Sequence, residues 1–547
     1  MKIALAQLNY HIGNFESNEN KVREAIEKAK ALGADLVVFA ELAVSGYPPR
    51  DFLEFDDFIK RCMQSVEKAA KACHGIAAII GGPSVNPEVK GKDLFNTAFF
   101  LEEGKIKAQV NKTLLPNYDI FDEYRYFEPN NEYKIIEFKG EKIALTICED
   151  LWNIGDDLLY RGNPMDDLLP FKPDLMINIA ASPFHYEQAN DRKAVLKANV
   201  EKYKLPLFYV NHVGAQTELL FDGGSLAFNK KGEIVGELAY FDEDLQIFDT
   251  DVLHQLPEIN QQQLPGKIEL IHDALVMGIK NYFGKLNLKK AILGLSGGID
   301  SAVTLVLAER ALGKENVRAI LMPSKFSSDH SIKDAEDLAK NLNIQYDIIP
   351  IEPGAAQVNE MLKTHFENLP FGIAEENIQA RMRGLILMAL SNKFGYILLN
   401  TSNKSEAAVG YGTLYGDMNG GLSVLGDVYK TEVFELARFI NKEAEVIPEN
   451  TIIKPPSAEL RPDQKDSDSL PDYAILDKVL YEYIENRQGP KELIEMGFDE
   501  AVVNRTLHLV NTNEYKRYQT PPILRVSRKA FGMGRRMPIV AKYLARD

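Results

Sequence analysis

Residues 290–312, KAILGLSGGIDSAVTLVLAERAL, place a Ser-Gly-Gly turn between a short apolar run and a long segment with helical apolar spacing. The first N–H groups of a helix have no partner within the helix, and the helix dipole adds partial positive charge, so this arrangement favours an anion. Gly297 and Gly298 carry no Cβ, which lets phosphate oxygens approach the main chain. The segment 294–301 therefore predicts a phosphate-binding turn, although a plain turn with Asp300 as a capping residue fits the same pattern.

Asp300 is the unexpected residue of this turn, because a carboxylate repels a phosphate. The repulsion becomes useful if Asp300 holds Mg²⁺, which then bridges phosphate oxygens. The hydroxyls of Ser296 and Ser301 can donate hydrogen bonds to the same group. The turn lacks the lysine of the Walker pattern and the spacing of the dinucleotide GxGxxG pattern, so it indicates a phosphate site outside both classes.

The segments around this turn alternate between strand and helix. We expect strands at 291–295, 317–323, 344–351 and 396–402, and helices at 268–286, 301–312, 331–342 and 374–394. Such alternation is typical of a parallel sheet that is wound on both faces. Residues 455–471 are rich in proline and charge, which predicts a mobile loop.

The first half of the chain shows strand signals that glycine and proline interrupt, with fewer helices between them. A helix is expected at 17–32 with Ser17 as its cap. The run 97–110 reads as a hairpin, so this half predicts a mixed sheet covered by helices. The Pro/Gln-rich residues 256–268 lack periodicity, and we assign them as a linker between domains at 1–255 and 269–547.

Composition restricts the class of protein. The chain has 547 residues, enough for two to four domains, and a net charge of −16, which argues against nucleic acid as a partner. We expect no membrane span, because no apolar run reaches about 18 residues. The three cysteines, Cys62, Cys73 and Cys148, are too few and too widely spaced for a disulfide framework or a zinc cluster, which favours a cytoplasmic location.

Glu41, Lys112 and Cys148 each end or follow a strand signal in the first half. Strand ends converge on one rim of a sheet, where catalytic groups commonly lie. A thiolate that attacks a carbonyl, a glutamate that moves the proton and a lysine that stabilises the developing charge suffice for amide hydrolysis. The ammonium would also lower the pKa of the thiol. Taken singly, each residue could instead be structural or solvated, as we expect for Cys62 and Cys73.

The first half resembles the nitrilase superfamily over residues 1 to about 255. FAELAVSGYPPRD, NKTLLPNYDIFDEYRYFEP and ICEDLW match its glutamate, lysine and nucleophile segments. The resemblance implies an αββα sandwich and a second glutamate near the nucleophile, Glu123, which could otherwise pair with Arg125. It further implies glutamine contacts at Tyr118, Ser182 and, by spacing only, Gln188.

The turn at 294–301 resembles the signature of the ATP pyrophosphatase superfamily, and the residues from IQARMRGL to DVYKTEVF resemble the NAD synthetase core. The resemblance implies ATP contacts at Gly294, Leu295, Ser296, Gly297, Gly298, Ile299, Asp300, Ser301 and Thr401. It implies contacts to deamido-NAD at Asn377, Arg381, Glu406, Asp417 and Lys516, and metal ligation by Asp300 and Glu406.

Several cations around these motifs could balance the charge of two nucleotides, or could be ordinary surface residues. They are Arg381, Arg383, Lys404, Lys430, Lys516 and Arg517. For Lys430 the two interpretations are level, whereas its place in a motif favours a functional Lys516.

Together the halves resemble the glutamine-dependent NAD⁺ synthetases. The resemblance implies that L-glutamine supplies ammonia through a dry channel and that ATP with Mg²⁺ adenylates deamido-NAD. It also implies a homo-oligomer assembled through the second half. The alternatives are an amidase fused to another adenylating amidotransferase, and a binding protein with an inactive amidase half.

Overall fold

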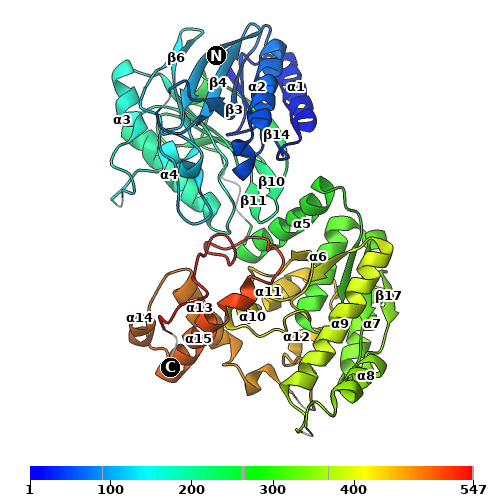
Figure 1. Cartoon of the computed structure of the whole chain (residues 1–547). Helices are drawn as coiled ribbons and strands as arrows, with labels where there is room; N and C mark the ends of the chain where they lie inside the picture. Colours follow the sequence, from blue (N-terminus) through cyan, green and yellow to red (C-terminus); the bar gives the residue numbers. More distant parts are fainter. Residues whose placement is uncertain (89, 157, 260–264, 368, 463, 545–547) are drawn as a thin grey trace. The chain divides into compact units, whose positions relative to one another are not determined.

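The computed structural model describes residues 1–88, 90–156, 158–259, 265–367, 369–462 and 464–544. The chain divides into two compact units, Met1–Leu264 and Pro265–Asp547 (Figure 1). Of the expected linker 256–268, residues 260–264 lie outside the described residues. In the part of the chain that the structure describes, no helix combines the length and apolar character needed to cross a membrane.

The first unit contains two six-stranded mixed sheets and one separate hairpin. The first sheet has the order β14-β1-β2-β3-β4-β5, with strands at Asp244–Asp249, Lys2–Gln7, Leu36–Val38, Ala77–Val85, Leu94–Glu102 and Lys105–Asn111. The second has the order β13-β12-β9-β8-β7-β6, with strands at Ile234–Glu237, Leu226–Phe228, Leu207–Val210, Leu175–Ile179, Glu141–Ile147 and Ile136–Phe138. Strands β10 (Val213–Gln216) and β11 (Leu219–Asp222) form the hairpin.

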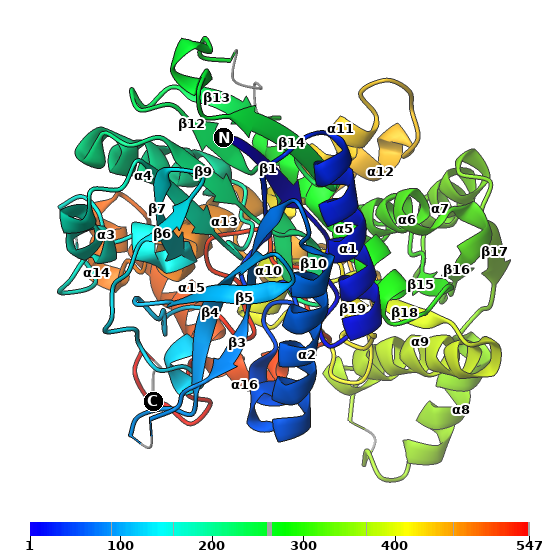
Figure 2. The ribbon, with the colours of Figure 1, turned by 90° about the horizontal axis from the view of Figure 1, so that it is seen from above.

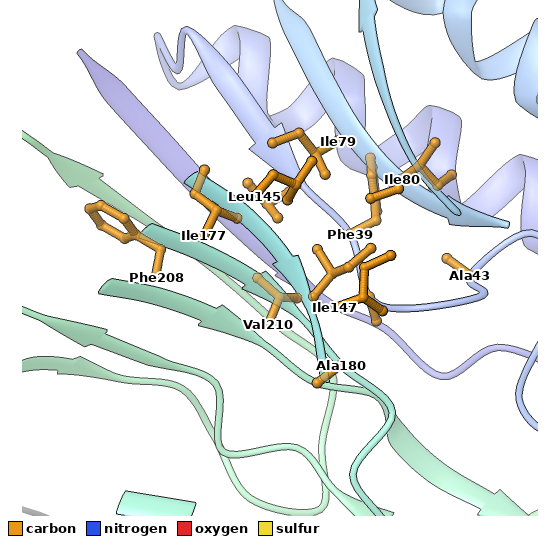
Figure 3. Close-up of a cluster of buried hydrophobic side chains, with 14 of the residues drawn as sticks. Phe39, Ala43, Ile79, Ile80, Leu145, Ile147, Ile177, Ala180, Phe208 and Val210 are labelled. Atoms are coloured by element: carbon orange, nitrogen blue, oxygen red, sulfur yellow. The ribbon is translucent and has the colours of Figure 1, made fainter. Parts of the chain in front are cut away.

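The two sheets pack face to face through apolar side chains. Phe39, Ile79 and Ile80 come from the β2 and β3 region of the first sheet, and they face Leu145, Ile147, Ile177 and Val210 of the second (Figure 3). Nearly every residue of β2, β3, β7, β8 and β9 is buried, which is why these strands read as continuous apolar runs rather than as alternating ones. The apolar contact therefore joins the two sheets close to the ends of β2 and β7.

Helices complete an αββα sandwich, the fold that the nitrilase resemblance implies. Helices α1 (Phe15–Ala31) and α2 (Asp56–Ala72) lie side by side on the first sheet, and α3 (Pro164–Leu168) and α4 (Gln188–Tyr203) lie on the opposite side of this unit (Figures 1 and 2). The hairpin expected at 97–110 is confirmed as β4–β5. The expected Ser17 cap is wrong: the Asn14 side chain is the cap and accepts a hydrogen bond from Ser17 N, because the helix begins two residues earlier.

The second unit contains a five-stranded, wholly parallel sheet in the order β17-β16-β15-β18-β19. Its strands are β15 (Ala291–Gly294), β16 (Val317–Leu321), β17 (Gln345–Ile348), β18 (Ile397–Asn400) and β19 (Leu422–Ser423). The chain runs outward from β15 through β16 to β17 and then crosses to β18 on the other side of β15. In such sheets, ligands bind beyond the carboxyl ends of the strands at this reversal, which here is the end of β15.

Helices surround this sheet as the alternating pattern predicts. They are α5 (Lys267–Lys285), α6 (Ile299–Leu312), α7 (Asp329–Asn341), α8 (Glu352–Leu362), α9 (Ile373–Phe394), α10 (Lys404–Val409), α11 (Lys430–Ile440) and α12 (Glu449–Ile453). Four helices near the C-terminus follow, α13 (Tyr473–Ile484), α14 (Pro490–Glu495), α15 (Glu500–Thr512) and α16 (Glu514–Arg517). The contacts of α13 and α15 with α10 extend the packed part of the unit beyond the sheet.

Candidate functional sites

Strand ends bring the predicted amidase residues of the first unit together. Glu41 lies shortly after β2, and Lys112 directly follows β5 of the same sheet. The Lys112 ammonium lies 2.7 Å from Glu41 Oε1 and 2.9 and 2.8 Å from the two carboxylate oxygens of Glu123. All three side chains are buried. Glu123 thus pairs with Lys112 and not with Arg125. The Arg125 guanidinium instead lies 3.8 Å from Asp51 and 3.9 Å from Glu54.

Neighbouring groups hold the two carboxylates in place. The Asn96 amide donates hydrogen bonds to Glu41 Oε1 (2.7 Å) and Glu123 Oε2 (3.4 Å). Ala181 N, just beyond β8 of the second sheet, donates to Glu41 Oε2 at 2.9 Å. The Tyr47 hydroxyl donates to Glu123 Oε1 at 2.9 Å. The cluster is thus a closed hydrogen-bond network that spans both sheets.

Cys148 directly follows β7 of the second sheet and adopts a left-handed backbone with φ of 44°. Burial and the Glu41 charge raise the pKa of its thiol well above the ordinary value, although the Lys112 charge acts to lower that pKa. Lys112 thus acts in the expected direction, but burial and Glu41 outweigh it, so the net pKa of the thiol is raised rather than lowered. At neutral pH the resting group is a thiol, and its proton must move when sulfur attacks.

Charges also set the state of the two partners of this thiol. Burial alone would lower the pKa of Lys112, but Glu123 and Glu41 outweigh it and raise that pKa well above the ordinary value. Burial raises the pKa of Glu123 to about 7, with Lys112 opposing this and Glu41 adding to it. The raised pKa therefore favours a protonated Lys112 between the side chains of Glu41 and Glu123.

The residues expected to contact glutamine form two hydrogen-bonded groups. The Tyr118 hydroxyl donates to Glu149 Oε1 at 2.9 Å, and the Tyr160 hydroxyl donates to the same oxygen at 3.1 Å. The Gln188 amide donates to Ser182 Oγ at 2.9 Å. Glu149 is a buried acceptor that the sequence analysis missed, although its position directly after Cys148 in ICEDLW is a signal that could have identified it.

The second unit contains a cavity of about 300 Å³ beyond the end of β15. The predicted ATP and metal residues that line it are Gly294, Leu295, Ser296, Gly298, Ile299, Asp300, Ser301, Thr401 and Glu406. Gly297 supplies the turn itself: it has φ of 80°, and a Cβ there would lie 2.1 Å from Ser331 O at the start of α7. The turn is therefore restricted to glycine at this position by both conformation and space.

Acidic side chains inside the cavity share one cation. The Lys430 ammonium lies 2.5 Å from Asp300 Oδ2 and 3.4 Å from Glu406 Oε1. The Asn403 amide donates to Asp300 Oδ1 at 2.8 Å. Burial raises the pKa of Glu406 to about 8, with Lys430 opposing this and Asp300 adding to it. Lys430 is thus a buried partner of the two carboxylates and not a solvated surface residue.

The residues expected to contact deamido-NAD converge on the segment 410–417. Asp417 lines the cavity and accepts a hydrogen bond from Thr413 N at 2.6 Å. Asn377 accepts from the Thr413 hydroxyl at 2.7 Å, and Arg381 donates to Leu414 O at 3.1 Å. Lys516 donates to Gly410 O at 2.7 Å and to Gly412 O at 3.0 Å. Asn377, Arg381 and Lys516 therefore support the wall of the cavity but are not among its lining residues.

Comparisons with known proteins place each half of the chain in a family. Residues 2–254 match the carbon-nitrogen hydrolase family, and residues 271–520 match the NAD synthase family. The chain is 46% identical to a glutamine-dependent NAD(+) synthetase of Synechocystis over 99% of both chains. It is 42% identical to the enzyme of the same name from Acinetobacter baylyi over 98% of both chains. The chain belongs to the glutamine-dependent NAD(+) synthetase family.

A solved structure from this family covers the same length. The glutamine-dependent NAD⁺ synthetase of Acinetobacter baumannii, in complex with ADP, aligns with a TM-score of 0.78 and 39% identity over 100% of this chain and 99% of that one. The αββα sandwich and the parallel-sheet unit are therefore the architecture of the family.

Two of the expected counter-charges in this family member are engaged in the fold instead. Lys404 is fully buried and pairs with Asp427 (3.0 Å) and Glu485 (2.8 Å). Arg517 donates to Ala407 O and Ala408 O and pairs with Glu514. Both expectations are wrong, because partners distant in sequence neutralise or satisfy these cations inside the protein.

The segment 455–471, expected to be a mobile loop, contributes to the cavity. Its residues Pro455 to Leu460 and Asp466 line the cavity. The Glu459 carboxylate accepts from the Ser328 and Ser331 hydroxyls at 2.9 and 2.8 Å, at the beginning of α7. Neither Glu459 nor Asp466 was singled out from the sequence, since proline and charge indicate a loop without indicating what it covers.

The Lys404→Met substitution is expected to lower the free energy of unfolding by about 3–5 kcal/mol, because it leaves the Asp427 and Glu485 carboxylates buried without their cation. Urea titration of the full chain measures the change. Lys491→Met is the matched control, since the Lys491 side chain is 83% exposed, and its change should stay within about 0.5 kcal/mol. Equal effects of the two substitutions would contradict a structural role for Lys404.

Proposed function

We propose that this protein makes NAD⁺ from deamido-NAD, ATP and L-glutamine, with AMP, pyrophosphate and glutamate as the other products. The observation that carries the proposal is the presence, in one chain, of a buried Glu–Lys–Cys cluster and a glycine turn at a cavity beyond a parallel sheet. Full-length identity to synthetases of this name supports it.

In the first unit, Cys148 sulfur attacks the side-chain carbonyl carbon of glutamine while Glu41 accepts the thiol proton. The Lys112 ammonium stabilises the oxyanion. Collapse of the intermediate breaks the carbon–nitrogen bond, and Glu41 returns the proton to the leaving ammonia. Water then hydrolyses the glutamyl thioester and releases glutamate. The raised pKa of the thiol supports this use of Glu41, because the proton is still on sulfur when substrate arrives.

Glutamine is oriented by its charged end. The Glu149 carboxylate, buried beside the nucleophile, is suited to receive the α-ammonium group, with the Tyr118 and Tyr160 hydroxyls holding its orientation. Ser182 and Gln188 supply polar groups for the other side of the substrate. A carboxylate at this position favours an amino-acid amide over a simple amide.

In the second unit, the turn at 294–301 presents backbone N–H groups to the phosphates of ATP. The nicotinate carboxylate oxygen of deamido-NAD attacks the α-phosphorus, and the bond to the β-phosphate oxygen breaks, so pyrophosphate leaves. Ammonia then attacks the acyl carbon of the adenylate. AMP departs with the former carboxylate oxygen, and nitrogen loses a proton. Delivery of ammonia through a dry channel would prevent its protonation before this step.

Asp300 and Glu406 are the residues we propose to hold Mg²⁺. No group of three or more His, Cys, Asp or Glu side chains within the described residues is arranged to hold a metal ion. One or two carboxylates completed by phosphate oxygens are nevertheless a common Mg²⁺ site, and hard carboxylate oxygens suit the ion. When bound, Mg²⁺ would neutralise phosphate charge, while the Lys430 ammonium contacts both side chains and holds them close together.

Two further proposals concern the protein in the cell. The three cysteines are buried free thiols, which supports a reducing, cytoplasmic compartment. The outer face of α9 exposes Ile373, Leu385 and Met388 at 75%, 64% and 37% of their surfaces. Exposed apolar side chains on one element can mark a surface that another molecule covers. We therefore assign this face to a homo-oligomer that forms through the second unit.

The Cys148→Ala substitution is expected to abolish NAD⁺ formation from glutamine and to preserve formation from ammonium, because it removes only the nucleophile. Product NAD⁺ is measured with deamido-NAD and ATP present and with either nitrogen source. Persistence of the glutamine-driven reaction would exclude the amidase assignment. Failure of the wild-type protein to form NAD⁺ from ammonium would exclude the synthetase assignment.

The Asp300→Asn substitution is expected to raise the Mg²⁺ concentration at half-maximal activity by at least about tenfold, whichever nitrogen source is used, because one proposed metal ligand loses its charge. Glutamine hydrolysis without ATP should be unchanged, since Asp300 lies in the other unit. An unchanged Mg²⁺ requirement would remove Asp300 from the metal site.

The Leu385→Glu substitution is expected to reduce the mass of the assembly, because it places a charge on the exposed apolar face of α9. Analytical ultracentrifugation measures the mass against the 61.5 kDa of one chain. Lys491→Glu, an exposed change on α14, serves as the control and should leave the mass unaltered. A wild-type monomer, or an assembly that Leu385→Glu leaves intact, would contradict the assignment of this face.

A further inference from the structure

The amidase groups come from two different sheets. Lys112 follows β5 in the first sheet, and Cys148 follows β7 in the second. Between the sheets lie apolar side chains such as Ile147 and Phe39 (Figure 3). Apolar contacts are not directional, so they hold the sheets together without defining the register between the two strand ends. The hydrogen bond from Ala181 N to Glu41 is one directional contact between the sheets, but it does not involve the lysine and cysteine segments themselves.

Asp150 makes a directional contact that does involve these two segments. Its Oδ1 accepts hydrogen bonds from Thr113 N at 3.0 Å and Leu114 N at 2.8 Å, the two residues after Lys112. Its Oδ2 accepts from Ile147 N at 3.0 Å, the residue before Cys148. The carboxylate is 2% exposed. One buried side chain thus binds the main chain next to the lysine and the main chain next to the nucleophile.

The environment of Asp150 favours a carboxylate over an amide or an apolar group. All three of its partners are N–H donors, so an asparagine would turn its NH₂ group toward a donor on one side. Burial raises the pKa of Asp150 to about 6, while the three backbone amides and the charge of Lys112 act to lower it. The Tyr133 hydroxyl is a further titratable neighbour, because the Asp150 charge acts to raise its pKa.

We propose that Asp150 is a positioning residue that sets the placement of Lys112 relative to Cys148 across the two sheets. The proposal rests on the glutaminase function proposed above. Asp150 does not touch the substrate in this scheme. It acts through the backbone, so that the ammonium faces the oxyanion and the thiol when the carbonyl is attacked.

Asp150→Asn is the direct test, because it keeps the shape and replaces one acceptor oxygen by a donor. Glutamine-driven kcat is expected to fall about 100-fold, the effect of a misplacement of about 1 Å. The KM for glutamine should change little, since the groups proposed to hold the substrate are untouched. Ammonium-driven NAD⁺ formation should stay within about twofold, because Asp150 lies outside the synthetase unit.

Alkylation of Cys148 by iodoacetamide separates a positioning role from a general loss of stability. The rate is followed by mass spectrometry of the Cys148 peptide as a function of pH. If Asp150→Asn moves the ammonium away from the sulfur, we expect the pH dependence of the rate to shift upward, since Lys112 acts to lower the thiol pKa. Loss of the Asp150 charge alone would shift it downward, so the direction of the shift distinguishes the two effects. This readout needs no glutaminase activity. A protein without glutaminase activity that shows the shift would exclude the proposed function and keep the positioning role.

Asn229→Ala is the matched control for stability. Asn229 is 1% exposed, lies in the first unit, and its side-chain oxygen accepts from Lys231 N and Glu233 N at 3.0 and 3.2 Å. Asn229→Ala therefore removes a comparable buried acceptor, but one that does not connect the lysine and cysteine segments. Its melting temperature should fall, while its glutamine-driven kcat and its alkylation profile should match those of the wild type.

Asp150→Glu provides the second variant if Asp150→Asn fails to fold. It keeps the charge and both oxygens but moves them by one methylene, and we expect an intermediate loss of glutamine-driven kcat and a smaller upward shift in alkylation. Wild-type kcat and an unshifted profile in either folded Asp150 variant would overturn the proposal. The same losses in Asn229→Ala would also overturn it, because they would then follow from stability alone.

Discussion

The ammonium of Lys112, enclosed between the carboxylates of Glu41 and Glu123, is the interaction on which the first unit depends. A buried charge is tolerated only when opposite charges and hydrogen bonds surround it, so two sheets must deliver their partners to one point. Glu41 arrives from the first sheet and receives Ala181 N from the second. The apolar contact between the sheets excludes water from the cluster. The ionic cluster in turn requires that the segments after β2, β5 and β8 meet at one point.

At the end of β15, the second unit places two acidic side chains close to the proposed nucleotide site, where they would repel phosphate groups. Its cavity contains Asp300 and Glu406 where a polyanionic nucleotide would bind, and Lys430 is placed between the two carboxylates. The parallel sheet contributes the reversal in strand order that opens this space, and Gly297 allows the turn to approach α7. Acidic side chains, an ammonium and backbone amides thus meet at the place where we propose that ATP binds.

The sequence predicted elements better than it predicted partners. Strand signals placed Glu41, Lys112 and Cys148 at strand ends, and the SGGIDS turn identified the start of α6, because both patterns are local. The partners of Lys404 were not predictable, since Glu485 lies 81 residues away and only the packing of α13 against α10 brings it near. Asn96 and Tyr160 were missed for the same reason. The cap of α1 is Asn14 and not the expected Ser17, because the sequence pattern did not define the first residue of the helix.

The left-handed backbone of Cys148 creates a conflict between stability and chemistry at one residue: the conformation favours glycine, whereas the proposed reaction requires a thiol. A residue with a Cβ costs about 1–2 kcal/mol in this conformation, whereas glycine adopts it freely. Glycine at this position would therefore favour the folded state and remove the sulfur. Selection for stability alone would therefore favour glycine over cysteine at position 148. Retention of the cysteine in a chain would report selection for chemistry rather than for stability.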